Sequence, residues 1–326
     1  MHKEPTHDSE HKSSRIRQLK EIIRPLAPMN IARSAILCAA IAMQLLSFTS
    51  CGNDSITYQS SGNWAGYITE QKGHDVVQVQ GTFTIPTVTK GCDAFMSPPK
   101  DSGMLPKSAI WVGIGGVDEA SLVQVGVIAT YGKITYRKVN NSDASIFKES
   151  IRPVATYYGF YETLPYASVK IPQLAVRPGD KMLASVRKVL GTNDSFVVSL
   201  KDLSRNEKPF SLTLNSPIGD GYGVPHMSAE WIVEKVSTNT SPNAPQYPLA
   251  GFSDIQFRNS GFKTSISPPG DSVSVQNRIA DGEVTNIHIF GIDALHKNYD
   301  LATPSSLLQG GSGFNVYDSK CTPSGN

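Results

Sequence analysis

LVQVGV at residues 122–127 is the stretch that decides the fold. Successive side chains of a β-strand point to opposite faces, so the three valines of this stretch share one face. Gln124 lies on the other face, together with Leu122 and Gly126. Alternation of this kind is typical of a half-buried strand and does not fit helical spacing. We therefore expect a strand here, with Gln124 facing away from the valines and Gly126 leaving room beside it for a substrate backbone.

A second strand of the same kind is AEWIVE at residues 229–234. Ala229, Trp231 and Val233 form its apolar face, which leaves Glu230 and Glu234 on the opposite face. Burying a carboxylate in such a strand costs free energy unless the carboxylate is paired or lines a wet groove. From the two strands alone, the preferred interpretation is that Gln124 and Glu230 are solvated and idle on an edge or outer face.

Short runs of this kind recur along the chain and are separated by turn residues. The sequence holds 27 Gly and 21 Pro with 18% charged residues, which is typical of many short strands joined by turns. We therefore predict an all-β fold, a β-sandwich, with surface loops at 95–107 and 238–248. The expected strands are residues 76–85, 108–113, 122–129, 155–162, 182–189, 195–200, 210–214, 229–236, 255–257, 272–278, 284–290 and 313–317.

The first 50 residues are expected to form a leader. Residues 34–48 are an apolar stretch that follows Arg33, as in a secretory signal, and the stretch is too short to span a membrane. It ends in SFTSCG, which is similar to a bacterial lipoprotein signal cleaved before Cys51, so Cys51 is a lipidation candidate. Plain secretion is the alternative. We expect an exported, monomeric protein that contacts a membrane only through this lipid. A short tether is expected at 51–62 and a single domain at 63–320.

Two further features concern export and binding partners. Cys92 and Cys321 are the thiols of the expected folded part, and an exported protein favours a disulfide between them over two free thiols. Residues 1–51 carry seven Lys/Arg and four Asp/Glu, so the net charge of +2 leaves the rest of the chain near −1. This charge gives no basic surface for nucleic acid, and we expect no nucleic-acid partner.

Common catalytic motifs are absent from the sequence. It has no H-E-x-x-H, P-loop, G-x-S-x-G or C-x-x-C, and its histidines have no partner at metal-ligand spacing. We expect no metal and no organic cofactor. A Ser-His-Asp triad stays open, because its members need not be adjacent in sequence. Covalent labelling with a serine-directed reagent would reveal such a triad.

The order of several short motifs resembles that of the eqolisins, the glutamic peptidase family first known from fungi. The motifs are NWAG at 63–66, GTFTIP at 81–86, IWVGI at 110–114, LVQVG at 122–126, YETLP at 161–165, PGD at 178–180, SAEWIVE at 228–234 and the segment 251–257. The resemblance implies a peptidase built as a sandwich of two curved antiparallel sheets, with its site on a concave face. It also implies that Gln124 and Glu230 are the catalytic residues and that their strands are neighbours. Gly115 departs from the family, whose fungal members have an acidic residue there.

A Glu/Gln pair has the chemistry that peptide hydrolysis needs. An ionised Glu230 can take a proton from the attacking water and return it to the leaving amine. The Gln124 amide can hold that water through its oxygen and the oxyanion through its N–H. A Glu that serves as both base and acid favours acidic pH, although burial could raise the optimum. The candidates for binding a polypeptide substrate are Trp64, Trp111, Tyr157, Phe160, Glu162 and Glu234.

A second hypothesis is a non-catalytic sandwich that binds peptide or glycan on an aromatic-lined face. Gly115 keeps this hypothesis open. The presence of both Gln124 and Glu230 argues against it, because a binding protein needs neither residue specifically.

Overall fold

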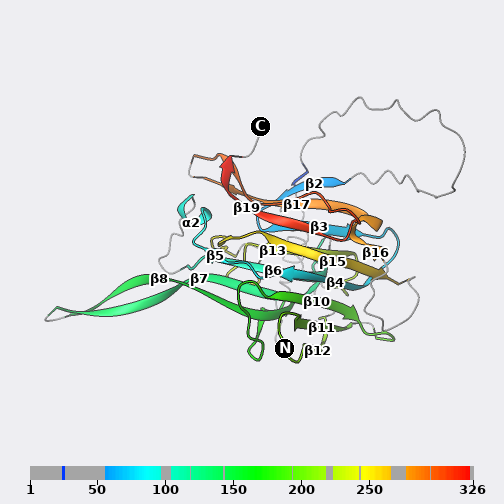
Figure 1. Ribbon diagram of the computed structural model, residues 1–326, viewed down its shortest axis with the longest axis horizontal. Helices are drawn as coiled ribbons and strands as arrows, with labels where there is room; N and C mark the ends of the chain where they lie inside the picture. Colours follow the sequence, from blue (N-terminus) through cyan, green and yellow to red (C-terminus); the bar gives the residue numbers. More distant parts are fainter. Residues whose placement is uncertain are drawn as a thin grey trace, which may run out of the picture.

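The computed structural model describes residues 24–25, 56–96, 104–117, 119–141, 144–192, 194–217, 223–241, 244–265, 277–293 and 295–323. Among these residues, backbone hydrogen bonds join 17 strands into one continuous network. Figure 1 shows the strands stacked across the body of the protein, with one long hairpin extending beyond it.

The network folds into two layers. The first layer runs in the order β9 (Val169–Ile171), β8 (Ala144–Thr163), β7 (Leu122–Asn141), β6 (Lys107–Gly115), β13 (Ser228–Glu234), β3 (Trp64–Glu70) and β17 (Glu283–Ile292). The second layer runs in the order β12 (Phe210–Asn215), β11 (Ser195–Asp202), β10 (Lys181–Lys188), β4 (Val76–Thr84), β15 (Ile255–Thr264), β19 (Phe314–Pro323) and β18 (Asn298–Pro304). Every pairing within the two layers is antiparallel, which confirms the predicted all-β sandwich.

The two layers are not separate sheets, because β17 pairs with β3 through one half and with β18 through the other. The shorter elements lie around this frame. They are β1 (Arg24–Pro25), β2 (Thr57–Ser61), β5 (Val88–Thr89), α2 (Asp93–Met96), β14 (Gly251–Phe252), β16 (Asn277–Arg278) and the 3-10 turn η1 (Ile279–Asp281). β2 pairs in parallel with β17 and lies inside the segment 51–62 predicted as a tether, so pairing begins before Asn63. Cys51 and most of the predicted leader and of the strand 272–278 lie outside the described residues.

The core lies between the layers and follows from strand alternation. Val125 and Trp231 of the first layer are buried with Phe83, Val198 and Phe257 of the second layer. Burying an apolar side chain of this size stabilises a fold by about 1.5–3 kcal/mol. The valine face of residues 122–127 is therefore the inner face of the first layer, and Gln124 lies on its outer face.

The hairpin of β7 and β8 is longer than predicted. The sequence favoured strands at 122–129 and 155–162, but the pairing continues out to Asn141 and Ala144. A register shift between Tyr131 and Lys133 accommodates Gly132, which has a φ of 102°. A glycine in a strand thus marks a bulge here and does not end the strand. In Figure 1 the hairpin reaches well beyond the other strands.

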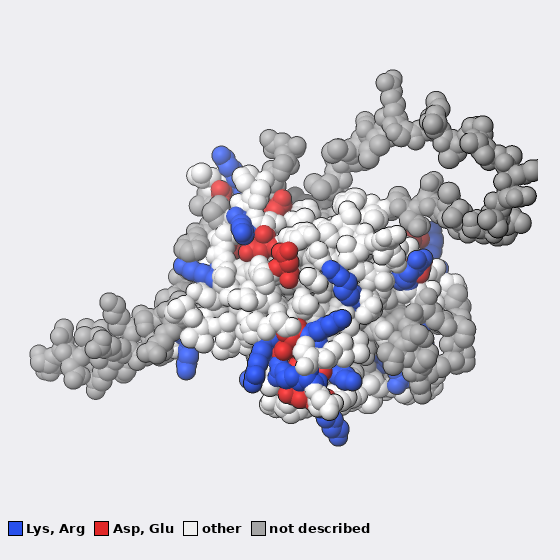
Figure 2. All heavy atoms as spheres, viewed as in Figure 1, with Lys and Arg blue, Asp and Glu red and all other residues white. Residues whose placement is uncertain are grey.

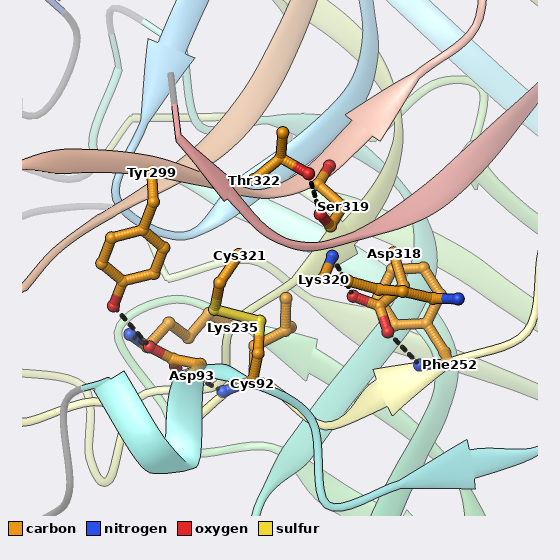
Figure 3. Close-up of a disulfide and its surroundings, with 11 residues drawn as sticks. Cys92, Asp93, Lys235, Phe252, Tyr299, Asp318, Ser319, Lys320, Cys321 and Thr322 are labelled. Carbon is orange, nitrogen blue, oxygen red and sulfur yellow. Dashed lines mark hydrogen bonds and ion pairs between the residues drawn. A yellow bond between two sulfur atoms is a disulfide. The ribbon is translucent and has the colours of Figure 1, made fainter.

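A disulfide closes the fold at one end. Cys92, next to α2, is bonded to Cys321 on β19 across a sequence separation of 229 residues. Beside this disulfide the carboxylate of Asp93 is buried and lies 2.9 Å from Lys235 Nζ, and the hydroxyl of Tyr299 donates to it at 3.3 Å (Figure 3). The three contacts join α2, the segment after β13 and the β18–β19 pair.

The surface carries charges of both signs. On the face in Figure 2, Lys and Arg side chains lie among Asp and Glu side chains and leave much uncharged surface between them. Within the described part of the chain, no helix is both long and apolar enough to cross a membrane.

Candidate active site

Gln124 and Glu230 lie on one face of the first layer. In the register of β6, Gly113 is opposite Gln124 on one side and opposite Glu230 on the other. Residues directly opposite one another in an antiparallel pair share a face. The expectation that β7 and β13 are neighbours is wrong, because β6 lies between them. With strands about 4.8 Å apart, the two backbones are separated by about 10 Å, and the residue between them has no side chain.

This outer face, which we call the site face, is largely apolar. A second cluster of buried side chains lies on it, apart from the main core. The cluster consists of Ile68, Ala109, Trp111, Leu122, Ile128, Phe160, Ile232 and Ile287. The polar residues of the site are therefore held among apolar neighbours, which makes each of their hydrogen bonds count for more than it would in water.

Glu230 is fully buried on this face. Its Oε1 accepts a hydrogen bond from the hydroxyl of Ser228, two residues earlier on the same face. Its Oε2 is buried and has no hydrogen-bond partner among the described residues. Burial raises the pKa of Glu230 well above its ordinary value, and the bond from Ser228 opposes this rise. One oxygen of Glu230 is thus fixed, while the other makes no hydrogen bond within the described part of the chain.

Gln124 is arranged in the same way. Its side chain is buried, and its Nε2 donates a 2.7 Å hydrogen bond to Oε2 of Glu162, the residue opposite it on β8. Its Oε1 is buried without a partner among the described residues. Glu230 and Gln124 thus each have one oxygen without a hydrogen-bond partner in the part of the chain that the structure describes, whereas buried polar groups normally find partners.

Glu162 and Glu234 add two further carboxyl groups to the site face. Burial, reinforced by the nearby Glu234, raises the pKa of Glu162 to about 8. Burial also raises the pKa of Glu234 to about 7, although Trp111 Nε1 donates a 2.7 Å bond to it. Both groups are consequently neutral in acid. Trp64 lies edge-on to Trp111, with ring centroids 5.2 Å apart. Trp111 therefore contacts Trp64 through its ring and Glu234 through its indole N–H.

The structure brings together most of the residues predicted from the sequence, with one exception. Trp64, Trp111, Phe160, Glu162 and Glu234 all belong to the site face, where Trp111 and Phe160 are buried.

Tyr157 is the exception. It lies opposite Ala129, on the core side of the sheet, and its hydroxyl accepts a hydrogen bond from the backbone N–H of Val88. The tyrosine on the site face is Tyr158, which lies opposite Ile128. Counting back from Glu162 in steps of two residues gives Phe160 and Tyr158. Strand alternation alone therefore predicts Tyr158, and not Tyr157, on the face of Glu162.

The space expected beside Gly126 is occupied by neighbouring atoms of β6. A Cβ on this residue would lie 2.1 Å from the backbone oxygen of Ile110 and 2.6 Å from Cβ of Trp111. Gly126 therefore lets β6 and Trp111 approach closely, and the expectation that it leaves space for substrate is wrong.

Glu119 is a site residue that the sequence did not indicate. Its Oε1 accepts the backbone N–H groups of His226 and Met227 at 3.0 and 3.1 Å, and its Oε2 lies 3.3 Å from Nδ1 of His226. It thereby holds the segment that leads into Ser228 and Glu230. Glu119 lies in a loop, where no periodicity points to it.

Glu119 also explains the departure at Gly115. A Cβ at Gly115, whose φ is 91°, would lie 2.7 Å from Glu119 Oε1 and 2.5 Å from the backbone oxygen of Ser121. A carboxylate from another position thus fills the space next to Gly115. The absence of an acidic residue at position 115 does not leave this corner of the site without one.

The site offers proton transfer and hydrogen bonding by side chains. Among the described residues, no group of three or more His, Cys, Asp or Glu could hold a metal ion. A buried carboxyl with a raised pKa is a group suited to take a proton from a bound water and return it.

The sequence matches the family model described as Peptidase A4 family over residues 62–287. No similar sequence is found among the curated proteins.

The solved structures that share the fold include three peptidase structures. Two are scytalido-glutamic peptidase with transition state analogs, at 18% and 19% identity and TM-scores of 0.54 and 0.53. The third is SCP-B, a member of the Eqolisin family of peptidases, in a complex with the tripeptide Ala-Ile-His, at 17% identity and a TM-score of 0.50. Each alignment covers 79% of this chain and 98% of the other chain.

Proposed function

Because this chain belongs to the Peptidase A4 family, we propose that it is an endopeptidase in which Glu230 and Gln124 carry out the hydrolysis. The chain is a glutamic-type peptidase, a hydrolase that acts on polypeptides. The assignment of this pair rests on where the two side chains lie. Both side chains are buried on the site face on either side of Gly113, and each has one oxygen that no described residue hydrogen-bonds.

The reaction begins with a water held between the two free oxygens. The ionised Glu230 takes a proton from this water as the water attacks the carbonyl carbon of the substrate. The proton on Glu230 then passes to the nitrogen of the leaving amine as the C–N bond breaks. Ser228 keeps the other oxygen of Glu230 fixed throughout, so the carboxyl does not rotate away from the water.

Gln124 acts on the same water and on the charge that develops. Its Oε1 accepts from the attacking water, and the N–H that is not bound to Glu162 donates to the oxyanion. Loss of one such donor in an oxyanion hole costs about 2.7–4 kcal/mol of barrier.

We propose that activity lies between acid and neutral pH. Glu230 must be ionised to act as the base, and its raised pKa moves the acid limb above that of an ordinary Glu. Above pH 7 to 8, Glu234 and Glu162 ionise as well and add negative charge beside the oxyanion. The rate should therefore fall again at alkaline pH.

The test is hydrolysis of an unfolded protein by the purified chain across pH 2–9. Glu230→Gln and Gln124→Ala are compared with two controls away from the site face, Glu207→Gln in the loop between β11 and β12 and Gln256→Ala on β15. Circular dichroism checks that all four variants are folded. We expect both site variants to lose at least about 100-fold in kcat and both controls to match the wild type. A folded but inert wild type would reject the peptidase and favour the peptide- or glycan-binding hypothesis. Hydrolysis that survives both site substitutions would reject the pair.

We further propose that the protein is exported and carries lipid on Cys51. The disulfide between Cys92 and Cys321 suits an oxidising compartment outside the cytoplasm. In a bacterial host, the wild type should incorporate labelled palmitate and Cys51→Ser should not. Export of an unlabelled wild type would favour plain secretion.

A further inference from the structure

Glu162 was expected to bind substrate, but its carboxyl is hydrogen-bonded to Gln124, the amide proposed to take part in the reaction. It lies directly opposite Gln124 in the β7–β8 register and accepts the bond from Gln124 Nε2 at 2.7 Å. The backbone N–H of Ser168, in the turn after β8, also donates to Glu162. The Glu162 carboxyl is therefore tied to the fold on one side and to Gln124 on the other.

The orientation of an amide decides what it offers to the reaction. The two ends of a Gln side chain have nearly the same shape but opposite hydrogen-bonding character, since the oxygen accepts and the nitrogen donates. Rotation by 180° about the last bond exchanges them. Gln124 with its nitrogen toward Glu162 turns its oxygen toward the other side, where Oε1 is buried and has no partner among the residues that the structure describes. Something must hold this orientation, because the apolar neighbours of the site face do not distinguish the two ends.

We propose that Glu162 is a positioning residue, which selects the orientation of the Gln124 amide that turns Oε1 to the attacking water and one N–H to the oxyanion. This inference rests on the proposed function of Gln124. An ionised carboxylate only accepts hydrogen bonds, so it favours the nitrogen of Gln124 over its oxygen, and a neutral carboxyl holds the same orientation when its carbonyl oxygen faces Gln124. Glu162 acts through Gln124 and does not touch the reacting atoms.

Two variants separate positioning from substrate binding. Glu162→Met keeps the length of the side chain but removes a strong acceptor. Glu162→Gln keeps an acceptor and removes the acid. We expect Glu162→Met to lose about 100-fold in kcat with KM within about threefold of the wild type, and Glu162→Gln to retain at least about a tenth of kcat. Glu207→Met is the matched surface control and should leave both constants unchanged.

A spectroscopic readout tests the bond itself. In a ¹H–¹⁵N spectrum of the full chain, the side-chain amide of Gln124 is identified by its absence in Gln124→Ala. One of its two protons should exchange slowly with water in the wild type and in Glu162→Gln, and both should exchange fast in Glu162→Met. A purely structural role for Glu162 would not predict this pattern.

Each outcome of these measurements either supports or overturns the positioning role of Glu162. A rise in KM with kcat unchanged in Glu162→Met would overturn the proposal and return Glu162 to substrate binding. Unchanged kinetics, or two fast-exchanging Gln124 protons in the wild type, would also overturn it. If Glu162→Met does not fold, the wild-type exchange and the kinetics of Glu162→Gln decide. A wild type without activity rejects the proposed function, and in that case the exchange measurement still decides whether Glu162 orients Gln124.

Discussion

Nε1 of Trp111 donates a 2.7 Å hydrogen bond to Oε2 of Glu234, and both side chains are largely removed from solvent. The indole thereby supplies a polar partner to a carboxyl in an apolar cluster. An unpartnered carboxyl there would carry the full cost of its desolvation.

Trp111→Phe should therefore destabilise the protein in a pH-dependent way. The bond favours the ionised form of Glu234, whose pKa is about 7. We expect a loss of about 1–3 kcal/mol in the free energy of unfolding at pH 8, and a smaller loss at pH 5, where Glu234 is neutral. Urea denaturation at both pH values measures the loss, and an equal loss at both would show that only the packing of the ring was affected.

The buried carboxyls should also make the wild type more stable in acid than at alkaline pH. A group whose pKa is raised in the folded state binds more protons than it does when unfolded, so it stabilises the fold below its ordinary pKa of 4.5. That contribution is lost as the pH rises through the folded value of about 7, and for Glu234 it amounts to about 3 kcal/mol. Thermal unfolding across pH 4–9 should show the fall, and Glu234→Gln should make it shallower. A Tm that rises over this range would contradict the assignment.

Gly113→Ala should reduce activity more than stability. A Cβ between Gln124 and Glu230 would lie 2.8 Å from the Trp111 ring, which its bond to Glu234 keeps from moving freely. We expect at least about a tenfold loss of kcat/KM with a loss of about 1–3 kcal/mol in unfolding free energy. Gly62→Ala, with nothing within 4 Å, is the matched control and should behave as the wild type. Full activity of Gly113→Ala would mean that the space between the pair is not used.

Ser228→Ala should shift the pH profile of the reaction. Its hydroxyl lowers the pKa of Glu230, so removing it should raise that pKa further. The acid limb of kcat/KM should then move up by about one to two pH units, because a hydrogen bond to a charged group is worth about 1.5–3 kcal/mol. Ser228→Thr keeps a hydroxyl and serves as the control. An unmoved limb would mean that Glu230 does not act as the base.

Removal of the disulfide should lower stability strongly. The bond closes a loop with a sequence separation of 229 residues, and in the chain-entropy account a loop of this length contributes about 5 kcal/mol. Cys92→Ser with Cys321→Ser should unfold at much lower denaturant concentration, with its midpoint measured beside the wild type under oxidising conditions. Coincident midpoints would show that contacts such as that between Asp93 and Lys235 are sufficient to close the fold.

Local alternation predicted the faces of the strands, because it follows from backbone geometry alone. It placed the valines of residues 122–127 in the core and assigned Gln124 and Glu230 to the outer side of their strands. Alternation does not predict the order of the strands in the sheet. Nothing in the local pattern says that β6 lies between β7 and β13, since pairing partners are chosen by the fold as a whole.

Two other differences have local causes. Tyr157 was expected at the site where Tyr158 lies, and one residue decides the face because the side-chain period of a strand is two. Glu119 reaches the site from a loop, where the chain follows no period and only the folded structure brings its carboxylate next to Gly115.

The bond between Cys92 and Cys321 determines what happens when a peptidase cuts the backbone of this protein. Gln124, Glu162, Glu230 and Glu234 all lie in the closed ring of backbone between these cysteines. A single cut in any loop of the ring opens it but releases no fragment, so both pieces remain attached. An enzyme that works among polypeptides, its own copies included, can in this way be nicked on the surface and still hold its working parts in one molecule.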